Sequence, residues 1–174
     1  SIIFETESNF NLANIFWVFD GYYKFSDSFI VFTEVLIDDY SIDRLSPHKI
    51  AFQTGLRYIQ KRYNISVNYV RINRWVGNYY DQDLIMMDSS IKIGHNLGPD
   101  AHQVELDAIF VPNNFSSLYA SFRFVNHGEG DLLESYPVNS TSNFGYHYED
   151  FPSGVNQYKF YFTFNYEFVF WKKY

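Results

Sequence analysis

Side-chain character alternates residue by residue along much of this chain, and the last strand-like segment shows the pattern most clearly. Every second residue from 158 to 170 is aromatic: Tyr158, Phe160, Phe162, Phe164, Tyr166, Phe168 and Phe170. The positions between them are mixed and include the charged residues Lys159 and Glu167. Successive side chains of a β-strand point to opposite faces. The pattern therefore predicts a strand with one apolar face and one face that tolerates ions.

The same alternation recurs upstream and predicts about eight strands in all. The further segments are 2–10, 15–25, 29–37, 50–58, 64–76, 104–110 and 118–124. The segment 64–76 is less regular, because Val67 and Tyr69 share one face whereas Val70 and Ile72 share the other. This irregularity suggests a β-bulge within that strand.

The connections between these segments alternate in length. Short turns are expected at Ser26-Asp27, at 62–64 and at 112–115, and long connections at 39–48, 77–102 and 127–156. Outer-membrane barrels pair short periplasmic turns with longer extracellular loops. The alternation therefore predicts one domain over 1–174, with the three long connections extracellular and both ends of the eight-strand run periplasmic.

Composition narrows the class of protein. The chain is 22% aromatic and 19% charged, and its 174 residues have a mean hydropathy of −0.25. It lacks any run near the ~18 apolar residues that a membrane helix needs. Strands that alternate apolar and polar residues keep the mean hydropathy ordinary. We therefore expect an all-β fold, an antiparallel transmembrane β-barrel of the bacterial outer membrane in contact with lipid. The alternative is a soluble all-β sandwich or lipocalin-like barrel whose aromatic face points inward.

Several classes of function are disfavoured. The net charge is −7 without a basic stripe, which argues against nucleic-acid binding, and the absence of cysteine excludes thiolate ligands and nucleophiles. Ser89 and Ser90 lie near His95 but outside any recognised nucleophile motif. His95, His102 and Asp100 have weak spacing for a metal site. We predict a non-enzymatic protein with no cofactor and no metal.

The charged residues of the second face are expected to point into the barrel lumen. They are Asp20, Lys24, Glu34, Arg57, Glu105, Asp107, Arg123, Lys159 and Glu167. If eight strands close alone, the lumen is just wide enough for side chains, and these charges should neutralise one another. In a larger barrel they would line water instead.

Three segments resemble one known family. They read VNYVRINRWVGNYYDQ from Val67, IKIGHNLGPDAHQVELDAIF from Ile91, and NHGEGD from Asn126. In their order and spacing they resemble the capsule assembly Wzi family. There, an E-Y-T-R-like strand leads to a Tyr-rich loop, and a Gly-x-x-Leu-Gly-Pro-Asp motif opens the next strand. Tyr69 to Arg71 matches the first element, with Asn68 in place of the acidic residue, and Gly94 to Asp100 matches the second.

This resemblance implies an outer-membrane β-barrel associated with capsule or other surface polysaccharide. Members of the family are longer, so this chain would supply roughly the C-terminal half. Further barrel strands or envelope subunits are then expected as partners. Two other functions stay open: a pore-forming or structural barrel subunit of a larger cell-envelope complex, and a soluble all-β binding protein.

Polysaccharide contact is expected in and beside the long loop 77–102. Aromatic rings stack on sugar faces, whereas carboxylates and amides bind hydroxyl groups. The candidate residues are Trp75, Tyr79, Tyr80, His95, Asn96, Asp100 and His102. The alternative is that Gly, Pro, Asn and Asp in this loop simply set turn geometry.

Overall fold

A computed structural model describes residues 16–39, 48–78, 87–88, 91–92, 95–134 and 150–169. The described residues form β-strands and connections but no helix, so they contain no helix that could cross a membrane. The strands are β1 (Trp17–Lys24), β2 (Phe29–Asp39), β3 (Lys49–Gln60), β4 (Tyr63–Ile72), β5 (Met87–Asp88), β6 (Ile91–Lys92), β7 (Ala101–Asn113), β8 (Ser116–His127) and β9 (Gln157–Phe168).

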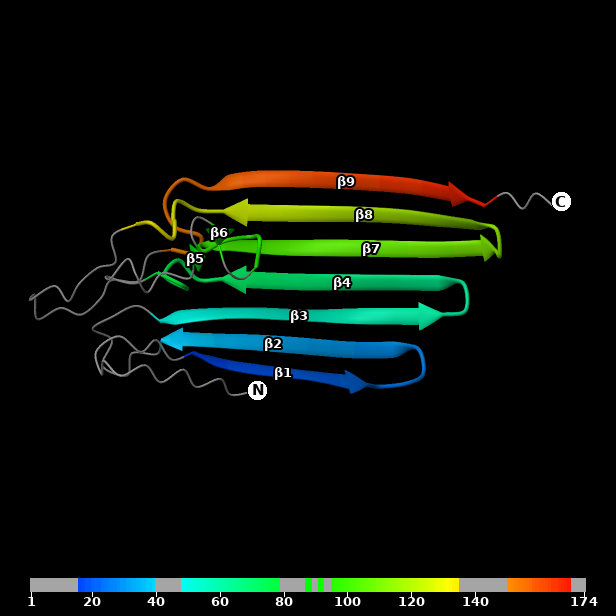
Figure 1. Cartoon of the computed structure of the whole chain (residues 1–174), viewed down its shortest axis with the longest axis horizontal. Coiled ribbons are helices and arrows are strands. Elements are labelled where there is room, and N and C mark those ends of the chain that lie inside the picture. The colour runs from blue at the N-terminus through cyan, green and yellow to red at the C-terminus, as the bar shows by residue number, and fades with distance from the viewer. Residues whose placement is uncertain are drawn as a thin grey trace, which may run out of the picture.

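Seven of the strands form one sheet in the order β1-β2-β3-β4-β7-β8-β9. Each strand pairs antiparallel with the next, so the sheet is a meander (Figure 1). The connection from β4 to β7 carries the short hairpin β5-β6, which forms a separate two-stranded sheet. Within the described residues the large sheet is open, because β1 and β9 lie at its edges.

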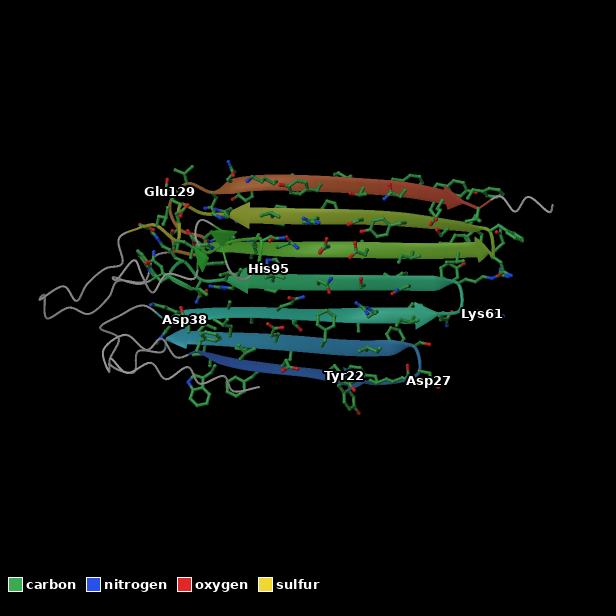
Figure 2. The ribbon with its side chains drawn as sticks, in the orientation of Figure 1. Tyr22, Asp27, Asp38, Lys61, His95 and Glu129 are labelled. Atoms are coloured by element: carbon green, nitrogen blue, oxygen red, sulfur yellow. The ribbon has the colours of Figure 1, made fainter. Side chains whose placement is uncertain are left out.

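The two ends of the sheet differ in their connections. Tight turns at 25–28, 61–62 and 114–115 join neighbouring strands at one end. The strand ends from which the long connections leave lie at the other end, as Figure 2 shows: Asp27 and Lys61 lie at the first end, Asp38 and Glu129 at the second. Short-range bonds close the turns, such as the 2.8 Å contact between Lys24 Nζ and Asp27 Oδ1. We call these the turn end and the loop end.

One face of the sheet is apolar from edge to edge. The register aligns one residue of each strand in a continuous row: Tyr23, Val31, Leu56, Val67, Leu106, Phe122 and Phe162. These side chains are largely uncovered, and Phe162 keeps 78% of its surface exposed. We call this surface the apolar face. It carries the alternating aromatic residues of β9.

The opposite face carries the charges. The register places all the charged residues expected in the lumen on this polar face, including Asp20 opposite Glu34 and Glu105 opposite Arg123. Few of these charged residues form ion pairs with one another in the described part of the chain. Glu105 and Arg123 form an ion pair at 3.1 Å, whereas Asp20, Glu34 and Arg57 have no ion pair with a described residue. The polar face is therefore mostly a solvated surface in this open sheet.

The all-β expectation is confirmed, and seven of the expected strands are present with shifted ends; the segment 2–10 lies outside the described residues. The predicted bulge in 64–76 is wrong. β4 pairs without a register shift from Tyr63 to Ile72, and the chain then turns at 73–77. Register shifts occur instead near Ile37 and near Phe110. Val70 and Ile72 are apolar because loop residues pack on them, which strand alternation cannot indicate.

Candidate binding site on the polar face

Loop segments fold inward over the polar face at the loop end. Residues 73–78 and 95–100 come from the β4–β7 connection and residues 128–134 from the β8–β9 connection, and the three segments meet above β2, β3 and β4. Val70, Ile72 and Val76 form a small buried cluster there, with Leu36, Ala51 and Leu97 packed against it. A cavity of about 180 Å³ lies beside this cluster. The loop end of the polar face is thus partly covered, while the turn end is open.

Asp100 ties three loop segments together. Its side chain is 1% exposed, and its carboxylate accepts hydrogen bonds from Gly130 N at 2.9 Å, Ser153 N at 3.0 Å and Ser153 Oγ at 2.5 Å. Its backbone carbonyl accepts a further bond from Gly128 N at 2.8 Å. Asp100 adopts the left-handed backbone conformation, with φ of 56°. Asp tolerates this region better than most residues, because its short side chain bonds locally.

A second set of polar contacts anchors the turn that follows β4. The buried Lys49 donates from Nζ to Asn78 O at 2.7 Å, and Gly77 N donates to Asp38 Oδ2 at 2.9 Å. Asn78 Nδ2 donates to Glu134 O at 2.8 Å. Arg74 forms an ion pair with the same Glu134. These bonds hold the turn 73–78 against the segment 128–134.

A polar pocket of about 480 Å³ lies beside these loops, over β7, β8 and β9. Gln103 and Glu105 line it from β7, Arg123 from β8, and Lys159 and Tyr161 from β9. His95 and Asn96 border it from the inward-folded loop. Figure 2 shows His95 in front of the sheet near the loop end. We call this the β7–β9 pocket.

The electrostatics of the pocket are uneven. Glu105 is satisfied by its neighbours: Arg123 Nε donates at 3.1 Å and Gln103 Nε2 at 3.4 Å. Lys159 has no hydrogen bond or ion pair with a described residue. Partial desolvation of its imidazole by the loop and the sheet lowers the pKa of His95 below its ordinary value, with the nearby Glu105 opposing the shift. The pocket therefore holds the Glu105-Arg123 ion pair and the exposed Lys159, which has no counter-ion among the described residues.

The structure brings only part of the predicted sugar-contact set together. His95 and Asn96 are exposed and border the pocket. Asp100 and Trp75, which is 6% exposed, are buried, so in this conformation they support the loops and offer no binding surface. His102 lies on the apolar face, 6.0 Å from the rings of Tyr69 and Phe124 and 5.9 Å from Phe151. Tyr79 and Tyr80, like Ser89 and Ser90, lie outside the described residues.

Sequence reasoning missed several members of the pocket. Glu105, Arg123 and Lys159 were expected as lumen charges but not as neighbours of the 77–102 loop. Gln103 and Tyr161 were not expected at all. Their one signal in the sequence is parity, because they alternate with apolar residues of their strands and so share a face. His95 lies on this face at the start of the segment 95–100, and the long-range contacts of Asp100 at the end of that segment have no local sequence signature.

Comparisons with family models, curated proteins and solved structures found no match. The functional argument therefore rests on the fold, on the pocket and on the motif residues of the sequence.

Proposed function

We propose that this chain forms part of the wall of a β-barrel in the bacterial outer membrane. We further propose that this barrel associates with surface polysaccharide and is not an enzyme. The single observation that carries the membrane part is the uninterrupted apolar face. A row of seven apolar side chains crosses the sheet on this face, whereas the charged residues expected in the lumen occupy the other face. Water would be a poor solvent for such a surface, and lipid tails would be a good one.

The lengths of the strands support this proposal. Six strands of the large sheet have 10 to 13 residues, and β1 has 8. Strands of soluble proteins most often have about 5 to 6 residues, whereas a tilted strand needs about 9 to 11 to span a bilayer. A uniform set of long strands is thus expected of a membrane barrel.

The borders of the apolar face also fit a bilayer. Toward the turn end it carries tyrosines, including Tyr63, whose ring stacks on that of Phe110 at 4.8 Å. Toward the loop end it carries the polar residues Arg71, His102 and Asn126, which are neighbours across the register. Aromatic girdles and polar residues are expected where strands leave the hydrocarbon layer.

The polysaccharide part of the proposal rests on the resemblance to the capsule assembly Wzi family. Two of its elements occupy distinct structural positions. Tyr69 and Arg71 lie on the apolar face of β4, and Arg71 stacks 3.7 Å above the ring of Phe151. Gly98 has φ of 75° and Asp100 carries the loop-tying carboxylate. Gly98 and Asp100 therefore shape the loops beside the pocket, whereas Tyr69 and Arg71 lie on the opposite face of the sheet.

Two measurements test the two parts. Carbonate extraction of membranes that contain the chain should leave it in the membrane pellet, because the apolar face lies in lipid; release into the soluble fraction would favour the soluble all-β alternative. Deletion of the gene should then reduce the polysaccharide retained on the cell surface. Unchanged retention in a strain whose barrel is membrane-inserted would contradict the polysaccharide part.

A pore or structural subunit is the second candidate. It is favoured by Asp20, Glu34 and Arg57, which lack ion-pair partners among the described residues and would suit a water-filled lumen. Ion conductance across planar bilayers, together with normal polysaccharide retention in the deletion strain, would select this function.

A further inference from the structure

The β7–β9 pocket has the chemistry of an anion site. The carboxylate of its acidic residue, Glu105, accepts hydrogen bonds from Arg123 and Gln103. The ammonium group of Lys159 is left without a partner among the described residues, in a chain whose net charge is −7. Lys159 is exposed at the border of the pocket, and a cation that borders a cleft without a counter-ion attracts an anionic ligand.

The donors of the pocket suit a carboxylate in particular. Arg123 uses Nε for Glu105, which leaves its other N–H groups for a ligand. Its guanidinium lies 5.6 Å from the centre of the Tyr161 ring, which limits the orientations it can adopt. A planar guanidinium pairs with a carboxylate through two parallel hydrogen bonds. Lys159 can add a third, charged donor on the neighbouring strand.

The remaining lining suits a sugar. The pocket volume of about 480 Å³ falls within the usual range for small-molecule sites. Tyr161 is 47% exposed and offers both a ring and a hydroxyl group, while His95 and Asn96 offer polar atoms from the opposite side. Sugar hydroxyl groups both donate and accept, so such mixed polar groups can bind them.

We propose that the β7–β9 pocket binds a uronic-acid residue, with Lys159 and Arg123 holding its carboxylate and Tyr161, His95 and Asn96 facing its hydroxyl groups. The inference rests on the polysaccharide part of the proposed function and narrows it to acidic polysaccharide. The proposal requires two features of the ligand: a carboxylate for the two cations, and a sugar ring whose hydroxyl groups meet the other polar side chains.

The test uses the full chain refolded in detergent, with binding followed by calorimetry. The probe is a short oligogalacturonate, and the matched neutral probe is its methyl ester. The acid should bind at least about tenfold more tightly than the ester, because charged hydrogen bonds are lost on esterification. Lys159→Gln should remove most of this preference. Arg57→Gln removes a cation from the same face outside the pocket and should leave the preference unchanged.

Equal binding of acid and ester would overturn the proposal, as would a preference that survives Lys159→Gln. Acetate provides a further arm: if it displaces the oligogalacturonate at similar concentration, the pocket takes a free carboxylate and the sugar assignment fails. None of these outcomes depends on membrane insertion or on glycan retention, so failure here is distinguishable from failure of the proposed function.

Discussion

At the scale of single residues, the least exposed groups serve the loops. Asp100, Asn78 and Lys49 are each at most 2% exposed, and their polar atoms bond to backbone groups of distant segments. Buried polar groups are tolerated when they are hydrogen-bonded and costly when a partner is removed. These residues are therefore expected to decide whether the inward-folded loops hold their position.

Replacing Asp100 should release the loops. Asp100→Ala leaves the amides of Gly130 and Ser153 without their acceptor and should destabilise this end by about 3 kcal/mol. Asp100→Asn keeps the shape and tolerates the left-handed conformation, so it should cost less. Hydrogen exchange at Gly128, Gly130 and Ser153 measures the effect. Asp150→Ala, at an exposed position, is the control; unchanged exchange in Asp100→Ala would contradict the loop-tying role.

The stability of the loop end should depend on pH through His95. Partial desolvation lowers the pKa of His95 below its ordinary value of 6.5, so the folded state disfavours its protonated form. Above this value the imidazole is neutral in both states and imposes no penalty. As pH falls below it, the unfolded chain takes up the proton more readily and stability decreases.

The measurement is the urea midpoint of unfolding at pH 7.5 and pH 5.5. His95→Gln should show a smaller decrease than the parent chain over this interval. Because both proteins share every other titrating group, the difference between their decreases isolates His95. Identical decreases would contradict the predicted direction of the pKa shift.

The two faces of β9 should respond differently to a charge. Phe162 lies in the apolar row, and Thr163 is its neighbour on the polar face. Phe162→Arg should cost about 2 to 4 kcal/mol of folding free energy in a bilayer if this row lies near the midplane. Thr163→Arg should cost much less. The measurement is denaturant-dependent folding into lipid vesicles, and equal costs on both faces would refute the lipid-facing assignment.

At the scale of elements, strand alternation and turn spacing determine most of the sheet. Aromatic and β-branched residues at every second position predict β2, β3, β8 and β9 to within three residues at either end. β4 breaks the pattern because Val70 and Ile72 are buried by loop residues, as is Val76 beyond the strand. The alternation of apolar and polar residues depends on what covers each face of a strand. A loop that covers one face therefore changes the sequence pattern, although the strand itself stays regular.

The positions of turns and loops predict a pattern of proteolysis. The turns 25–28, 61–62 and 114–115 share one end, and the strand ends from which the long connections leave share the other. If the loop end faces the exterior, protease added to intact cells should cut within 77–102 or 127–156 before it cuts at Ser26-Asp27. Cuts at the buried Asp100 and Gly130 should be slow. Mass spectrometry locates the sites, and preferential cutting in the turns would invert the topology.

At the scale of the whole molecule, the direction of the edge strands restricts how the sheet can close. β1 and β9 both run from the loop end to the turn end, as the arrows in Figure 1 show. They are therefore parallel to each other. Every pairing within the large sheet is antiparallel, so closure in the same pattern requires an odd number of additional strands between them. In lipid, unpaired strand edges are too costly to persist.

Cysteine cross-linking tests this parity, and the chain contains no native cysteine. Even one intervening strand would separate β1 from β9 by about 10 Å, beyond the reach of a disulfide. A pair of cysteines at Tyr22 and Thr163 should therefore not form a disulfide. A pair at Arg123 and Tyr161, which are opposite in the register, should form one readily. Efficient cross-linking of the edges would show direct closure.

The sequence alone determined the class of structure, the strands and their faces, because these follow from short-range periodicity: a residue's face depends on whether its position is odd or even, and turns occur where the alternation stops. Tertiary structure decided which loop residues reach the polar face. Asp100 meets Ser153 across 53 positions, and the fold of β7, β8 and β9 brings His95 and Lys159 to the border of one pocket. Such long-range contacts depend on chain closure and on burial of polar groups, which no local pattern encodes. The predicted sugar contacts Asp100 and Trp75 are for this reason buried supports, while Gln103 and Tyr161 line the pocket.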